Sequence, residues 1–133
     1  MSGNTNKVNV DDRVSIITFS VPTAAHLNAY QKRLRVLHKA VVDKAGDKTF
    51  NVDGHRFNQG TLGTVVKVGH ADTSRRVVVP EGGNFNAAID TAKQYIHEST
   101  VRLVASLEKQ LAAAKRLEST LLKDIEVKEL DWD

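Results

Sequence analysis

Apolar side chains recur along the chain with different spacings in different segments. The first two segments with a clear pattern predict a strand and a helix. From Arg13 to Ser20 both alternating sets of positions are largely apolar, which is typical of a strand covered on both faces. Over residues 23–45 apolar residues recur every three or four positions, which indicates an amphipathic helix with Thr23 as N-cap and Gly46 just past its end. The apolar stripe of this predicted helix consists of Leu27, Tyr30, Leu34, Leu37 and Val41.

A β-hairpin is predicted next, because Asp53-Gly54 stands between two short alternating segments and suits a type I′ turn. In that register Phe50 pairs with Phe57 and Val52 pairs with His55, so these four side chains share one face. Two more strands are expected over residues 61–68 and 75–79.

The longest pattern begins near residue 86 and continues to about residue 126 without proline or glycine. It predicts one helix of roughly 60 Å, whereas a compact globule of this chain length is only about 35–40 Å across. Either the helix breaks near Ala112-Ala113-Ala114, or its far half packs against another chain. The number of leucines favours the second alternative, so we expect homo-oligomerisation. The expected interface residues are Leu103, Leu107, Leu111, Leu117 and Leu121.

Together these elements predict an α+β fold with a mostly antiparallel sheet of about five strands. A medium helix (23–45) and a long C-terminal helix (about 86–126) complete the order β-α-β-β-β-β-α. Residues 1–12 are polar without a period and are expected to form a flexible arm, and residues 13–133 are expected to form a single domain.

Composition removes several classes of function. The absence of cysteine excludes disulfides, thiolate metal sites and cysteine nucleophiles. No apolar run approaches the roughly 18 residues of a membrane span, and the first residues do not form a signal peptide, so we expect a cytoplasmic protein with no membrane partner.

The charge is uneven along the chain. Residues 1–80 carry 12 Lys+Arg and 6 Asp+Glu, a balance of +6, and residues 81–133 carry 7 and 10, a balance of −3, which together give the net charge of +3. The two parts can attract each other within one chain or between copies. The net positive charge is therefore only weak evidence for nucleic-acid binding. Lys32, Arg35 and Lys39 form a basic face on the predicted helix, an interaction surface for a protein partner or, less favoured, for nucleic acid.

No catalytic motif is recognisable. The histidines lack the i, i+4 spacing of a helical metal pair, and no glycine-flanked serine elbow is present. We therefore expect no enzyme, no metal and no cofactor.

One segment indicates a binding site. Two glycines directly precede the long helix, and the free N–H groups of a first helical turn favour a phosphate. An aromatic ring there can stack on a base, asparagines can bond its edge and arginines can neutralise charge. The segment matches neither the Walker A motif nor the dinucleotide fingerprint. The candidate ligand-binding residues are Arg56, Arg75, Arg76, Asn84, Phe85 and Asn86.

We therefore expect a non-enzymatic, oligomeric binding protein that holds a small phosphorylated, nucleotide-like ligand near the start of the long helix. Small viral or mobile-element proteins that sequester nucleotide signals have this general build. The alternatives are a protein–protein module, inhibitor or assembly factor acting through its helices, and a nonspecific nucleic-acid binder acting through the basic face of residues 23–45.

Overall fold

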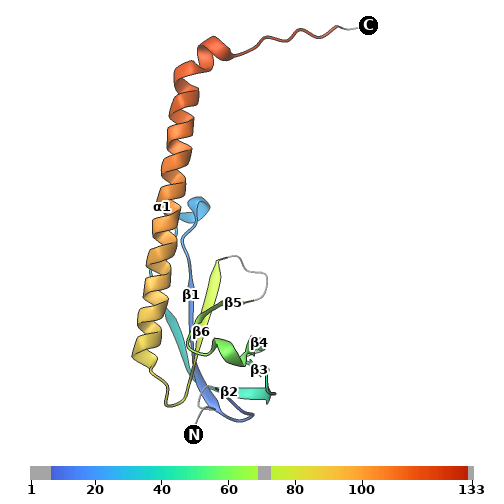
Figure 1. Ribbon diagram of the computed structural model, residues 1–133, viewed down its shortest axis with the longest axis vertical. Coiled ribbons are helices and arrows are strands. Elements are labelled where there is room, and N and C mark those ends of the chain that lie inside the picture. The colour runs from blue at the N-terminus through green and yellow to red at the C-terminus, as the bar shows by residue number, and fades with distance from the viewer. Residues whose placement is uncertain (1–6, 69–72, 132–133) are drawn as a thin grey trace.

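The computed structural model describes residues 7–68 and 73–131, and it confirms the α+β fold class (Figure 1). A six-stranded antiparallel sheet in the order β4-β3-β2-β1-β6-β5 packs on α1 (Phe85–Asp124), the one α-helix of the described residues. The strands are β1 (Arg13–Ser20), β2 (Arg35–Ala45), β3 (Thr49–Val52), β4 (His55–Asn58), β5 (Val65–Lys67) and β6 (Ser74–Pro80). Two 3-10 turns, η1 (Ala24–His26) and η2 (Gln59–Thr61), lie in the connections.

The central strand β1 is apolar on both faces because it lies between two hydrophobic clusters. Ile16 belongs to a cluster on the concave side of the sheet, and Ile17 belongs to a cluster beneath α1. Phe57 from one edge strand and Val66 from the other both reach the concave cluster. The sheet therefore curls into a half-barrel, and α1 covers its opposite face (Figure 1).

The predicted hairpin is confirmed. Phe50 pairs with Phe57 and Val52 with His55, and the turn residues Asp53 and Gly54 have φ values of 52° and 76°. Two positive φ values are what a type I′ turn requires.

The predicted helix over residues 23–45 is wrong. Only η1 is helical there, Thr23 makes no side-chain cap hydrogen bond, and residues 35–45 form strand β2 between β1 and β3. Gly46 belongs to the turn after β2, where its N–H donates to the Thr49 carbonyl oxygen at 2.8 Å. The backbone hydrogen bonds that β2 makes to two neighbouring strands replace the helical ones, and tertiary context overrides the local helical pattern.

The connection from β1 to β2 is held by Tyr30 and Leu34. The Tyr30 hydroxyl donates to the Ser20 carbonyl oxygen at 2.7 Å, and burial raises the pKa of this hydroxyl. Leu34 packs into the cluster beneath α1. The stripe residue Leu37, expected to be buried, is instead 47% exposed on β2.

Residues 8–12 of the predicted flexible arm contact the rest of the domain. Val8 is buried in the concave cluster, and its N–H and carbonyl groups bond to the Gln59 side chain at 2.9 and 2.8 Å. A tight turn at Asp11, whose φ is 72°, then leads into β1. Residues 1–6 of the predicted arm lie outside the described residues.

The long helix is confirmed and continuous. It begins at Phe85, where the Asn84 side chain caps it by accepting from the Ala87 N–H at 2.9 Å, and it runs without a break through Ala112-Ala113-Ala114 to Asp124. Neither it nor any other described helix is sufficiently long and apolar to traverse a membrane.

Candidate functional site

A β-bulge in β2 aims His38 at the start of α1. The pairing of β1 with β2 shifts register between Val14 and Ile16, and Lys39 has a φ of 60° within this irregular stretch. The turned backbone places the His38 ring 5.3 Å from the Phe85 ring, centroid to centroid, with Nδ1 3.0 Å from the Ser15 Oγ. Bulges often redirect a side chain in this way next to a functional site.

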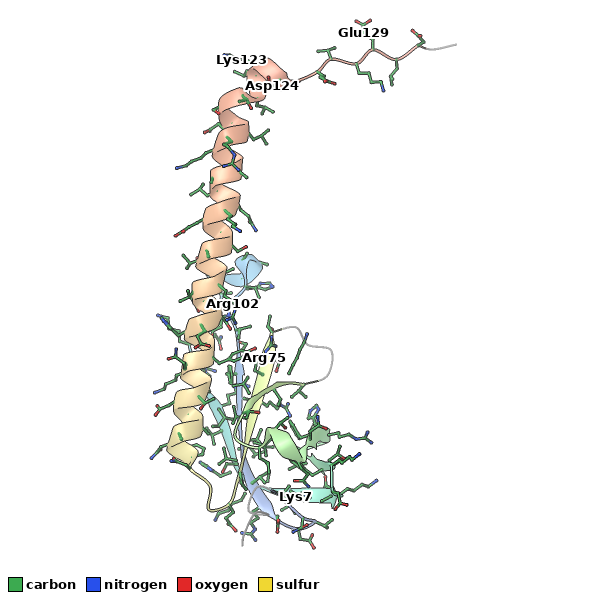
Figure 2. All side chains as sticks on the ribbon, viewed as in Figure 1. Lys7, Arg75, Arg102, Lys123, Asp124 and Glu129 are labelled. Atoms are coloured by element: carbon green, nitrogen blue, oxygen red, sulfur yellow. The ribbon has the colours of Figure 1, made fainter. Side chains whose placement is uncertain are left out.

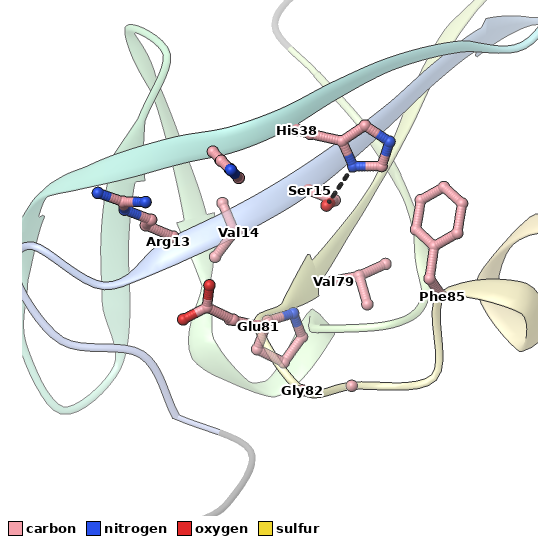
Figure 3. A pocket seen from close by; sticks show the side chains of 11 residues that line it. Arg13, Val14, Ser15, His38, Val79, Glu81, Gly82 and Phe85 are labelled. Atoms are coloured by element: carbon pink, nitrogen blue, oxygen red, sulfur yellow. Dashed lines mark hydrogen bonds between the residues drawn. The ribbon is translucent and has the colours of Figure 1, made fainter.

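A cavity of about 400 Å³ opens beside this ring pair, between the bulge, the end of β6 and the first turn of α1 (Figure 3). Val14, Val79 and Phe85 give it an apolar lining, and Ser15 and His38 supply polar atoms. The remaining lining residues are Arg13, Lys39, Pro80, Glu81, Gly82 and Gly83. The arrangement suits a small ligand with a planar apolar part, and two cationic side chains against one carboxylate favour an anionic group.

The predicted ligand-binding residues are not all brought together. Phe85 lines the cavity, but the Asn84 side chain caps the helix and Asn86 is exposed in the first turn without lining the cavity. The two glycines expected to admit a ligand, Gly82 and Gly83, do line it.

The three predicted arginines lie elsewhere. Arg75 is beneath α1, where its Nε donates to the Tyr95 hydroxyl oxygen at 3.0 Å. Arg76, the next residue along β6, points to the opposite face of the sheet. Its guanidinium group lies 3.8 Å from the Asp53 carboxylate at the hairpin turn. Arg56 is exposed on β4. Neighbouring strand residues point to opposite faces, so Arg75 and Arg76 cannot serve one ligand.

The predicted basic face of Lys32, Arg35 and Lys39 does not form one helical row. Lys32 lies in the connection before β2, Arg35 begins β2 and Lys39 lies in the bulge. All three are exposed, so the positive charge stays on the surface but is spread over a strand and a loop.

The predicted interface leucines all lie on α1. The helix contacts the sheet from Phe85 to Ile96, and its distal half, residues 101–124, extends beyond the sheet (Figure 1). Leu103 and Leu107 are half-buried, whereas Leu111, Leu117 and Leu121 are 55, 58 and 43% exposed. These leucines lie on one helix face as an apolar stripe, whose exposed part begins at Leu111.

Sequence reasoning missed Ser15, His38 and Arg13. The alternation of apolar residues in β1 does not indicate that Ser15 lines a cavity, and the helical spacing of residues 23–45 assigns His38 to a helix. No group of three His, Asp or Glu side chains suited to a metal ion occurs among residues 7–68 and 73–131.

No family model matches the chain, and comparisons with curated proteins and with solved structures find no match either.

Proposed function

We propose that the protein is a non-enzymatic, self-assembling binding module, in which the distal halves of α1 from two copies pair. The observation that carries this proposal is the exposed leucine stripe on a helix that extends past its own sheet. Pairing removes this apolar surface from water, which is the main favourable term in most protein association. The sheet and the first half of α1 form the head, whose cavity at Phe85 is the binding part of the module.

The spacing of the stripe identifies a second copy as the partner. Leu103 and Ile125 stand eleven residues on either side of Ala114, Leu107 and Leu121 stand seven, and Leu111 and Leu117 stand three. When two copies run antiparallel and cross at Ala114, each of these residues meets its counterpart. A two-fold symmetric interface requires this self-complementarity.

The head determines the direction of pairing. Ala92, which is buried under the sheet, Leu103 and Ala114 follow one another at eleven-residue intervals, or about three helical turns, so they lie on one helix face. The sheet and the free stripe therefore share a face. In a parallel pair both sheets would have to lie between helix axes only about 8–10 Å apart, and they would collide.

The antiparallel arrangement avoids this collision because each head lies beyond the end of the partner's helix. The resulting dimer is a rod with one head at each end and with both Phe85 cavities open. Such a particle presents two copies of the same binding site at a fixed separation.

The test compares two neighbouring leucines of α1. Leu121 belongs to the stripe, whereas Leu122 is rotated by about 100° and is 94% exposed. We expect wild type and Leu122→Asp to sediment with the mass of a dimer and Leu121→Asp to sediment as a monomer. Both variants change the same residue type at the same end of the helix, so helix propensity is matched.

A monomeric wild-type protein would contradict the proposal. Equal loss of the dimer in both variants would also contradict it, since the interface would then not follow the stripe. Far-ultraviolet circular dichroism of each variant verifies that α1 is retained.

A further inference from the structure

A second cavity, which we call the arginine cavity, lies at the other end of β1, far from the bulge. It has a volume of about 210 Å³, and Arg33 and Arg35 line it together with Gln31, Ser20 and Ser74. Thr18 and Phe19 complete the lining, so none of the described residues around it is acidic. Two guanidinium groups with hydroxyl and amide donors suit carboxylates.

An exposed acidic segment follows α1. Residues 125–131 are extended and exposed, and the apolar Ile125, Val127 and Leu130 are 56, 87 and 68% exposed (Figure 2). The segment carries three carboxylates, Glu126, Glu129 and Asp131, against one lysine. We call it the acidic tail.

The acidic tail cannot reach the arginine cavity of its own chain. Phe19 lines that cavity and contacts the Tyr95 ring, with centroids 6.0 Å apart, which fixes the level of the cavity along α1. From Tyr95 to Asp124 the helix rises by about 43 Å. Seven fully extended residues cover at most about 25 Å.

The acidic tail of a partner can reach it. In an antiparallel pair that crosses at Ala114, Ile125 lies beside the partner's Leu103, about 12 Å along the helix from the level of Tyr95. The next six residues span about 20 Å when extended. The tail also leaves α1 sideways, toward the side of the helix on which the sheet lies (Figure 1).

We propose that the acidic tail of one copy binds in the arginine cavity of the other, with its carboxylates on Arg33 and Arg35. The two contacts are related by the two-fold axis and clamp both ends of the helix pair. This inference rests on the dimer proposed above. It explains why opposite charges stand in the two parts of the sequence.

The test uses the only tryptophan of the chain, Trp132, as a reporter beside the tail. In full-length protein at low salt, we expect its emission to shift to longer wavelength by several nanometres in Arg33→Ala/Arg35→Ala. The dimer dissociation constant should rise roughly tenfold, since each pair of exposed charges contributes modestly. A matched control, Lys44→Ala/Lys48→Ala, removes two exposed cations elsewhere and should leave both quantities unchanged.

A second pair of variants checks the contact directly. Arg33→Glu/Arg35→Glu should lose the wild-type emission, and adding Glu126→Arg/Glu129→Arg in the same chain should restore it. Inorganic phosphate should change the wild-type emission only as much as sodium chloride of equal ionic strength does. A specific displacement by phosphate would overturn the tail as the occupant.

The outcomes separate this inference from the dimer. A wild-type dimer whose emission and dissociation constant are unaffected by Arg33→Ala/Arg35→Ala overturns the tail contact and leaves the dimer standing. A wild-type monomer overturns both.

Discussion

At the scale of single residues, Phe85 is both the first residue of α1 and part of the cavity lining. Its ring packs with the cluster beneath α1 on one side and stands against His38 on the other. An aromatic face next to cationic side chains from β1 and β2 is a suitable platform for a ring that carries an anionic group.

We predict that Phe85→Ala weakens the binding of a nucleoside monophosphate by about five- to 150-fold in calorimetry, because stacking on an aromatic ring contributes about 1–3 kcal/mol. Arg13→Ala should weaken it less, since Arg13 is an exposed cation. Arg56→Ala, which changes an arginine on β4 away from the cavity, is the control and should bind as wild type does.

Wild-type protein that takes up no nucleotide would contradict this reading of the cavity. So would an Arg56→Ala variant that loses as much affinity as Phe85→Ala.

Only part of this site was predictable from individual residues. Phe85 and the two preceding glycines were found because they adjoin a long, unmistakable helical pattern. Ser15 and His38 were not found, because their meeting depends on a bulge between strands, which no local residue pattern announces. Arg75 and Arg76 were assigned together because they are neighbours in sequence, whereas a strand points them apart.

At the scale of elements, strand β2 shows why a helical spacing can mislead. Short apolar segments fit the periods of both helices and strands, and residues 35–45 include three β-branched valines. Neighbours distant in sequence then decide, since β2 is paired with β1 on one side and with β3 on the other. The bulge at Lys39 lets this strand keep both pairings.

The bulge makes a prediction about stability. Lys39 has a φ of 60°, a conformation that costs a non-glycine residue about 1–2 kcal/mol and costs glycine almost nothing. We expect Lys39→Gly to raise the free energy of unfolding by about 0.5–1 kcal/mol in urea titrations, because this relief exceeds the extra chain entropy of glycine.

Lys44→Gly is the matched control, since Lys44 lies in the same strand without a positive φ. This substitution should lower the free energy of unfolding. Destabilisation by both changes would show that the left-handed backbone at Lys39 carries no strain.

At the scale of the whole molecule, the length of α1 was the most informative feature of the sequence. An unbroken helix of this length is longer than a compact domain of this size is wide. The structure confirms that α1 is continuous and extends past the sheet. The shared face of sheet and stripe could not be predicted with equal ease, because it depends on which side of α1 the sheet covers. That face is what makes an antiparallel pair the consistent arrangement.

The most direct test of this account is disulfide cross-linking between single-cysteine variants, since the natural chain has no cysteine. In the antiparallel dimer Leu107 of one copy faces Leu121 of the other, and two copies of Leu107 lie about 21 Å apart along the axis. Cysteines bond only when their Cα atoms lie within about 7 Å.

Mixing Leu107→Cys with Leu121→Cys under mild oxidation should therefore give a covalent dimer, and neither variant should cross-link with itself. Self-cross-linking of each variant alone, without a mixed product, would show a parallel pair and contradict the account.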